Sequence, residues 1–263
     1  MCYDISYKIT LQTIEDFFEG IIFDEGDQLD LSFDGTHIMG HAYGLHPIIY
    51  RHREDQLLHC RPMEWGCLPF YVKDEKQFIR QRASMLNARS ERIVDDHNSY
   101  WYKIREHRCL VPVNGIYEHR AIKGWKKKVP YYITLHNQST FFLPALYAVT
   151  ELPDTTTGEM IKRYTYSIIT RSANSVMRNI HNDGDSRGRM PLFLPFEQSL
   201  EWINHALPLD HYKEILNFEM PAELLQYHPV FTIRSAKMRP DDKPKNEYWH
   251  WEKLPALGEM NPD

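Results

Sequence analysis

The chain has 263 residues and a mass of 31.3 kDa, which is enough for one large domain or two small ones. No stretch approaches the roughly 18 apolar residues of a membrane span, and the polar N-terminus lacks the apolar core of a signal peptide. We therefore expect a cytoplasmic protein that does not bind membranes. The four cysteines form no Cys-x-x-Cys pair and are too sparse for a disulfide framework, which excludes the small disulfide-stabilised secreted class.

Charge is distributed unevenly along the chain. Residues 73–189 contain 20 Lys and Arg against 12 Asp and Glu, whereas the remainder contains 11 against 24, for a net charge of -5. A basic central block between acidic flanks indicates a surface that meets an anion, and nucleic acid is the commonest large one.

The second residue, Cys2, is the most distinctive chemical feature of the sequence. Removal of Met1 would leave Cys2 with a free α-amine and a thiol on adjacent carbons. Their pKa values are roughly 7.7 to 8.0 and about 8.5, so part of the amine is unprotonated near neutral pH. An aldehyde would react with this amine to give a Schiff base, and the thiolate would then close a thiazolidine ring. The alternative is a second-position cysteine without a role.

Periodicity and turn residues predict a series of short elements in the first half of the chain. Helices are expected over residues 13–20, 74–85 and 95–108, the second with Asp74 as its N-cap. Residues 24–35 are acidic and rich in turn formers, which is typical of a surface loop.

Five histidines lie between residues 37 and 59: His37, His41, His46, His52 and His59. Although His37 and His41 are four residues apart, glycines at positions 40 and 44 argue against a helix there. No Cys or carboxylate partner has zinc-like spacing, so we expect solvated or core histidines and no metal site.

The second half of the chain is dominated by strand-like runs. Residues 109–120 read as an edge or bulged strand, and further strands are expected over 129–135, 140–150, 162–170, 192–194 and 230–233. Ser172 is expected to cap a short helix ending near residue 181, and two more helices are expected over 197–206 and 210–217. No regular alternation of strand and helix favours a parallel sheet. We predict an α+β domain over residues 1–235, built on a mostly antiparallel, partly barrel-like sheet with surrounding short helices, and an irregular tail over 236–263.

Several side chains have complementary chemical roles. Cys2 is a nucleophile, Glu118 and His181 form an acid/base pair, Asn87 is a neutral hydrogen-bond donor, and Arg89 and Arg189 suit phosphate. The aromatic residues Trp65, Phe70 and Tyr71 fit either a core segment or a platform that stacks on unpaired bases.

These residues occur within motifs that resemble the SRAP family (SOS response-associated peptidases, or abasic site processing proteins). In chain order the motifs are Met1-Cys2, Trp65-Gly66-x-x-Pro69, Asn87-Ala88-Arg89-x-Glu91, Arg108-Cys109-Leu110-x-Pro112 leading to Gly115-x-Tyr117-Glu118, Thr170-x-x-Ala173-Asn174, and Ile180-His181 with Arg189-Met190-Pro191.

The resemblance implies a protein that binds single-stranded DNA at an abasic site and links Cys2 to the ring-opened sugar as a thiazolidine. It implies that Glu118 handles the proton as the ring opens, that His181 assists Schiff-base chemistry, and that Asn87 orients the reacting end. Arg89 and Arg189 would hold phosphates. A peptidase-type hydrolytic activity linked to removal of Met1, and a lyase activity, are also implied, without a metal or organic cofactor. We expect a monomer.

Several features depart from the family pattern: His119 stands where the family usually has Trp, the stretch from Cys2 to Trp65 is longer than expected, and two more lie beside the candidate residues. Tyr3-Asp4 replaces the Gly-Arg that usually follows the cysteine, and residues 182–188 separate His181 from Arg189, so this segment must loop out if both reach one site. Two other functions fit the residues. One is an N-terminal cysteine hydrolase that acts on amide bonds, and the other is a non-catalytic nucleic-acid-binding module.

Overall fold

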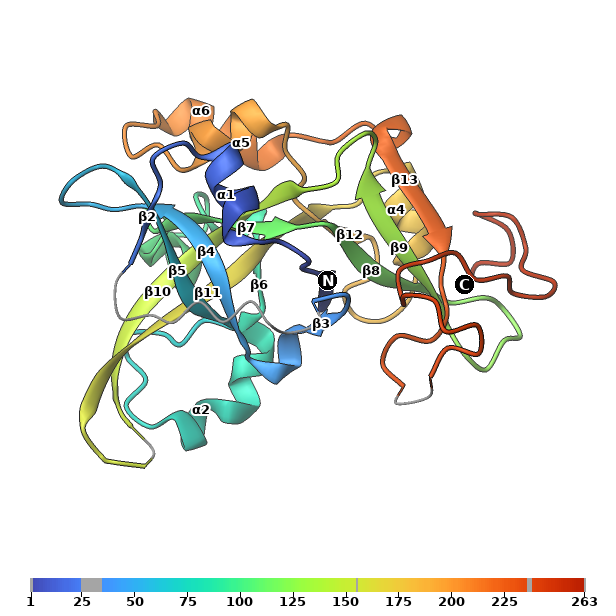
Figure 1. Ribbon diagram of the computed structural model, residues 1–263, viewed down its shortest axis with the longest axis horizontal. Coiled ribbons are helices and arrows are strands. Elements are labelled where there is room, and N and C mark those ends of the chain that lie inside the picture. Colours follow the sequence, from blue (N-terminus) through green and yellow to red (C-terminus); the bar gives the residue numbers. More distant parts are fainter. Residues whose placement is uncertain (1, 25–34, 155, 236–237, 263) are drawn as a thin grey trace.

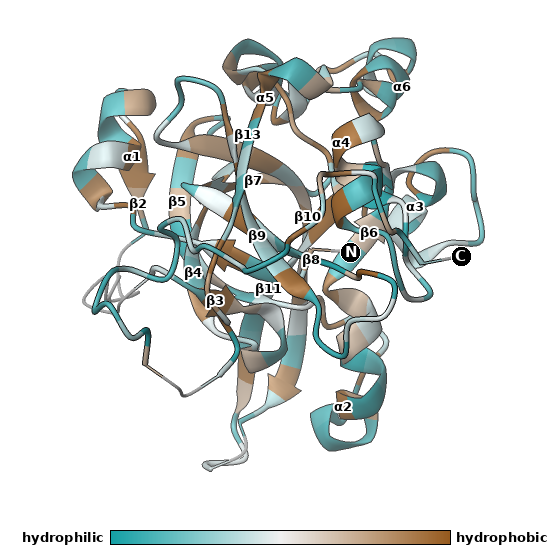
Figure 2. Ribbon diagram, turned by 90° about the vertical axis from the view of Figure 1, so that its right-hand side faces the viewer, coloured by the Kyte–Doolittle hydropathy of each residue, from teal (hydrophilic) through white to brown (hydrophobic). Residues whose placement is uncertain are grey.

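Two β-sheets packed around a shared hydrophobic core form the body of the protein (Figure 1). The computed structural model describes residues 2–24, 35–154, 156–235 and 238–262. Apolar residues concentrate on the strands, whereas hydrophilic residues predominate on the connecting loops (Figure 2). The predicted α+β class is confirmed. The loop expected over 24–35 lies, apart from its two end residues, outside the described part of the chain.

The larger sheet closes into a barrel. The barrel is formed by the strands β5 (Leu58–Trp65), β4 (Leu45–Arg51), β7 (Arg108–Val113), β10 (Phe141–Pro153) and β11 (Met160–Ser172), in that order around the ring. Neighbours in this order pair antiparallel. A short parallel pairing of β11 with β5, with Tyr166 opposite Trp65, closes the ring. The prediction of a mostly antiparallel, partly barrel-like sheet is confirmed.

Three short strands extend the barrel. β2 (Ile22–Phe23) pairs with β5, while β6 (Asn87–Arg89) and β12 (Arg189–Pro191) both pair with β11. Asn87 and Arg189 lie about a hundred residues apart in sequence. Because β6 and β12 both pair with β11, the two residues lie beside the same barrel strand.

The smaller sheet holds the N-terminus inside the molecule. Its strands, in spatial order, are β13 (Leu225–Pro229), β9 (Val129–Leu135), β8 (Gly115–Arg120), β1 (Asp4–Ser6) and β3 (Ile38–Met39). Asp4 lies opposite Tyr117 on one side and Met39 on the other. Because β1 is enclosed between two strands, Cys2 is delivered to the middle of the fold, where Figure 1 marks the N-terminus.

The segment 109–120 differs from the expected edge strand. It forms two strands, β7 and β8, which turn at Asn114 and belong to different sheets, and each has a partner on both sides. Gly115 permits this turn, since a Cβ at that position would lie only 2.4 Å from the ring of Tyr132. The run is apolar because both strands are buried, which a sequence cannot distinguish from an edge strand with one buried face.

Short helices cover the sheets. They are α1 (Leu11–Phe17), α2 (Glu75–Arg82), α3 (Tyr100–Lys103), α4 (Ser175–Ile180), α5 (Phe196–Trp202) and α6 (Leu209–Asn217), with 3₁₀ turns η1 (Gly40–Ala42), η2 (Ala83–Met85), η3 (Ser90–Arg92) and η4 (Ala222–Leu224). Asp74 caps α2 as predicted, accepting a hydrogen bond from the backbone of Lys76. None of the helices in the described residues is long and apolar enough to cross a membrane.

Several boundaries differ from those predicted. The helix expected over 95–108 shortens to α3, because Asp96 bonds to the backbone of Asn98 and the helix begins only after Ser99. Asn174, not Ser172, caps α4, because Ser172 is still paired within β11. The strands expected over 192–194 and 230–233 lie a few residues earlier, as β12 and β13.

The C-terminal segment is fixed to the domain although its described residues form no helix or strand beyond one isolated bridge. The buried guanidinium of Arg120 donates hydrogen bonds to the carbonyls of Pro255, Ala256 and Glu259, at 3.0, 2.7 and 2.7 Å. Trp251 also donates its indole N–H to the carbonyl of Val230. The segment therefore packs against the end of β8.

Candidate active site

Cys2 is completely buried between the two sheets. The side-chain amide of Asn87 donates a hydrogen bond to its carbonyl oxygen at 2.9 Å. β6 carries Asn87 and is fixed in turn by parallel pairing with β11. Burial raises the pKa of the Cys2 thiol well above its ordinary value, and the nearby carboxylate of Glu118 raises it further. The thiol is therefore neutral, and the hydrogen bond from Asn87 fixes the backbone carbonyl of the same residue.

Glu118 is the second buried group of this site. It lies on β8, only 5% exposed, and burial raises the pKa of its carboxyl to about 7. Its Oε1 has no hydrogen-bond partner among the described residues, and the same is true of Oδ1 of Asn87. A carboxyl with a near-neutral pKa can both donate and accept a proton at physiological pH. The two unsatisfied oxygens are acceptors for a donor that the described residues do not supply.

His181 follows the last turn of α4, which packs against β8. Its Nδ1 lies 2.8 Å from the carbonyl oxygen of Arg189. Because a carbonyl only accepts, Nδ1 carries the hydrogen and Nε2 carries the lone pair. Burial lowers the pKa of the ring to about 4, so His181 is neutral at pH 7.

The segment 182–188 loops out, so that His181 and Arg189 lie in contact. Asn182 anchors its start to the end of β8, because its amide accepts from the N–H of Ala121 at 2.8 Å and donates to the same residue's carbonyl at 2.9 Å. Gly188 closes the loop by donating its backbone N–H to the carbonyl of His181. The two ends of the loop therefore lie side by side at His181.

The two arginines differ in their surroundings. The guanidinium of Arg189 bonds to the carboxylate of Glu91 through both terminal nitrogens, and to the carbonyl oxygen of Thr170 at 2.6 Å. Arg89 is exposed at the end of β6. Arg189 would have to leave Glu91 before it bound a phosphate, whereas Arg89 is directly accessible.

The three aromatic residues also separate into two groups. Trp65 is completely buried, stacks on Tyr166 and donates its indole N–H to the carbonyl of Leu86. The interpretation of Trp65 as a base-stacking platform is therefore wrong, because the ring has no accessible face; it supports the segment leading to Asn87. Phe70 and Tyr71 are each 56% exposed and form an aromatic cluster with Tyr100.

A hollow of about 520 Å³ opens beside these groups. Its lining includes Glu118 and His181 together with residues that were not among the predicted catalytic or DNA-binding residues: Asp4, His119, Lys128, Asp183 and Arg234. Arg234 donates from Nε to Asp4 at 3.0 Å, and His37 lies 2.8 Å from the same carboxylate. Burial alone would raise the pKa of Asp4, but these partners hold it below its usual value. No motif marks Arg234, which reaches the site only through the fold.

The fold and the motifs define an SRAP domain. The SOS response associated peptidase (SRAP) family matches the chain over residues 1–233, and the chain belongs to this family. A crystal structure of a protein from Bacteroides thetaiotaomicron superposes with a TM-score of 0.70 and 26% identity, covering 94% of this chain and 97% of the other.

Curated relatives include bacterial and animal proteins. Over 142 residues the chain is 32% identical to the abasic site processing protein YoqW of Bacillus subtilis (strain 168), a match that covers 54% of this chain and 56% of YoqW. The abasic site processing protein HMCES of Rattus norvegicus is 24% identical over 194 residues, with coverage of 65% and 52%. The chain thus spans a little over half the length of these relatives.

Proposed function

We propose that the protein, once Met1 is removed, captures abasic sites in single-stranded DNA as a covalent adduct on Cys2. The observation that carries this proposal is the meeting of Cys2, Asn87 and Glu118 at the centre of the fold, beside an accessible hollow. Relatives that share the family are named abasic site processing proteins, which supports the same substrate. An abasic site is one of the few aldehydes that a cellular macromolecule presents.

The chemistry proceeds in two steps. The α-amine of Cys2 attacks the aldehyde carbon of the ring-opened sugar, and loss of one water gives a Schiff base. The thiol then adds across the carbon–nitrogen double bond, so that a carbon–sulfur bond forms and the thiol proton passes to nitrogen. The product is a five-membered thiazolidine, and no electron donor or acceptor is needed.

The buried groups have distinct roles in this proposal. Glu118, with its pKa of about 7, protonates the ring oxygen as the sugar opens and the hydroxyl as water leaves. His181, neutral at pH 7, accepts the proton that the amine loses. Asn87 fixes the Cys2 carbonyl, and its unsatisfied Oδ1 is an acceptor for the new α-ammonium or a sugar hydroxyl.

Binding of the strand is assigned to exposed groups. Arg89 contacts a phosphate directly. Arg189 contacts a phosphate after its ion pair with Glu91 breaks. Phe70 and Tyr71 stack on unpaired bases, because their rings are accessible. The peptidase description of the family fits hydrolysis of the bond between Met1 and Cys2. A lyase activity would follow from the Schiff base, which makes elimination of the sugar phosphate possible.

A denaturing gel tests the proposal. Protein whose intact mass shows that Met1 is absent is incubated with single-stranded DNA bearing one abasic site, with undamaged DNA as a control. We expect a denaturation-resistant complex that requires the lesion, disappears in Cys2→Ala and persists in Cys60→Ala, which removes another buried thiol. A complex that survives Cys2→Ala, or no complex with processed wild-type protein, would overturn it.

A further inference from the structure

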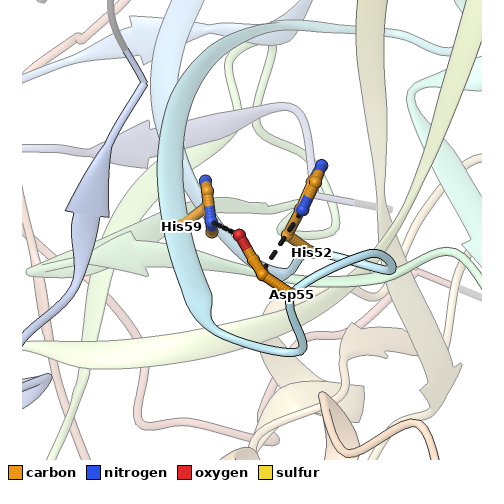
Figure 3. Close-up of side chains that lie close together, drawn as sticks. All are labelled: His52, Asp55 and His59. Atoms are coloured by element: carbon orange, nitrogen blue, oxygen red, sulfur yellow. Dashed lines mark hydrogen bonds and ion pairs between the residues drawn. The ribbon is translucent and has the colours of Figure 1, made fainter.

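The loop between β4 and β5 carries a second cluster of titratable groups. This loop is the light-blue one at the left edge of Figure 1, away from the N-terminus. His52 and Asp55 in this loop and His59 at the start of β5 each offer one ligand atom, and these atoms all lie within 4.8 Å of one another. Figure 3 shows the two imidazoles on either side of the carboxylate. The cluster takes no part in the proposed chemistry at Cys2.

The contacts converge on the carboxylate of Asp55. Nε2 of His59 lies 3.0 Å from its Oδ2, and Nδ1 of His52 lies 3.3 Å from its Oδ1. Nδ1 of His52 is buried yet has no hydrogen-bond partner among the described residues. A lone pair on that nitrogen would face the negative carboxylate without a hydrogen or a cation between them. A cation placed between the two groups would satisfy both.

A second carboxylate fixes the orientation of His59. Asp24, which follows β2, lies 2.6 Å from Nδ1 of His59, and the hydroxyl of Tyr50 donates to its other oxygen at 2.9 Å. With its hydrogen on Nδ1 and directed at Asp24, His59 presents the lone pair of Nε2 to Asp55. A carboxylate that accepts from the far nitrogen is the usual outer partner of a metal-binding histidine.

We propose that this loop binds one divalent first-row transition cation through Nδ1 of His52, the carboxylate of Asp55 and Nε2 of His59. Two imidazoles and one carboxylate, with water at the remaining positions, suit Zn²⁺ or its neighbours in the series better than Mg²⁺ or Ca²⁺. Ligand bonds of roughly 2.0 to 2.2 Å require the three atoms to draw closer together. The side chains of His52 and Asp55 are 35% and 38% exposed and have room to do so. The bound ion would tie the loop, through His59 and Asp24, to the end of β2.

Titration of the full-length, untagged, chelator-treated protein with Co²⁺ tests the site by visible absorption, and Zn²⁺ competition gives its affinity. Asp55→Asn is the decisive variant, since its side-chain oxygen can still accept the Leu57 N–H that shapes the turn. We expect one equivalent bound by the wild type, at least tenfold weaker binding in Asp55→Asn and His52→Ala, and unchanged binding in His97→Ala, which removes an exposed histidine elsewhere. Asp24→Asn should weaken binding by about 10- to 100-fold.

Three results would overturn the proposal: a titration without saturation at one equivalent, binding of equal strength in wild type and Asp55→Asn, and a thiolate-to-cobalt absorption band. The last would place the ion on a cysteine instead. The unfolding midpoint of each variant is compared with that of His97→Ala before titration. If Asp55→Asn does not fold, the affinity of His52→Ala is compared with that of the wild type instead.

Discussion

The buried carboxyl of Glu118 lowers the stability of the folded protein near neutral pH. Its carboxyl is buried, and its pKa rises from 4.5 to about 7 in the folded chain. The folded state therefore binds the proton more tightly than the unfolded chain, so stability falls as pH rises through this window. The difference corresponds to about 3 kcal/mol at pH values above 7. A proton held near neutrality is useful for the proposed ring opening, and its cost is lower stability.

The substitution Glu118→Gln separates these two effects. We expect the stability difference between the variant and the wild type to grow in favour of the variant by about 3 kcal/mol from pH 4.5 to pH 8, because the amide does not ionise. Adduct formation should slow by about 10²- to 10⁴-fold, because the acid is lost. Urea unfolding at a series of pH values measures the first effect, with exposed Glu197→Gln as the matched control. A stability difference that does not change with pH would contradict the assignment.

The motifs indicated which residue types the candidate site contains, but not the burial or the partners of those residues. Asn87, Glu118 and His181 were selected as a donor and an acid/base pair, and each is partly or fully buried where such a role is possible. The pairing of Arg189 with Glu91 was not predictable, because it depends on strands that meet only in the fold. The burial of Trp65 is one of the two alternatives that the sequence left open.

At the scale of elements, the loop 182–188 is held by Asn182, which makes two hydrogen bonds to the backbone of Ala121. Asn182→Ala should lower the free energy of unfolding by about 1 to 3 kcal/mol, because a partly buried N–H and carbonyl lose their partner. It should also slow adduct formation, since His181 adjoins the anchor. Urea unfolding and gel assays measure both, with Ser186→Ala in the same loop as the control. Equal loss in the two variants would show that Asn182 has no special role.

The exposed aromatic pair makes a separate prediction about DNA binding. Phe70→Ala and Tyr71→Ala should each weaken binding of undamaged single-stranded DNA by about 1 to 3 kcal/mol, since each removes one stacking surface. Their unfolding midpoints should change little, because both rings are more than half exposed. Fluorescence anisotropy measures the affinity, and Tyr248→Ala, an equally exposed aromatic in the C-terminal segment, is the control. Unchanged affinity would place the strand elsewhere.

Strand-like runs in the sequence located most strands but not their neighbours. The runs near residues 129–135, 140–150 and 162–170 all form strands, since β-branched and aromatic residues favour them. The pairing of β11 with β5 and β6, which closes the barrel and positions Asn87, joins residues about 80 to 100 positions apart. Local sequence carries no signal for such a contact.

At the scale of the whole molecule, the charge pattern overstated the basic surface. Arg82 and Arg163, both within the basic block, are partly or fully buried in a network with the carboxylates of Glu64 and Glu75. Lys128 is paired with Asp183, and both residues line the hollow. Counting charges along a chain cannot tell which of them face solvent, so fewer cations are available to DNA than the excess suggests.

The C-terminal segment is joined to the domain through Arg120. Arg120→Met keeps an unbranched stem but removes the donors to Pro255, Ala256 and Glu259. We expect a loss of about 3 kcal/mol or more in the free energy of unfolding, because three carbonyls lose charged donors. Limited proteolysis should release the segment before the domain is cut, whereas exposed Arg80→Met should behave as wild type. Cleavage at the wild-type rate would contradict this attachment.

The central claim is that residue 2 itself forms the bond to the lesion. Tandem mass spectrometry of the adduct, after nuclease and trypsin digestion, locates the sugar remnant directly. We predict that it lies on the peptide covering residues 2–8, attached at both the amine and the sulfur of Cys2. A remnant on a lysine such as Lys128, which lines the hollow, or the absence of any modified peptide would contradict the account.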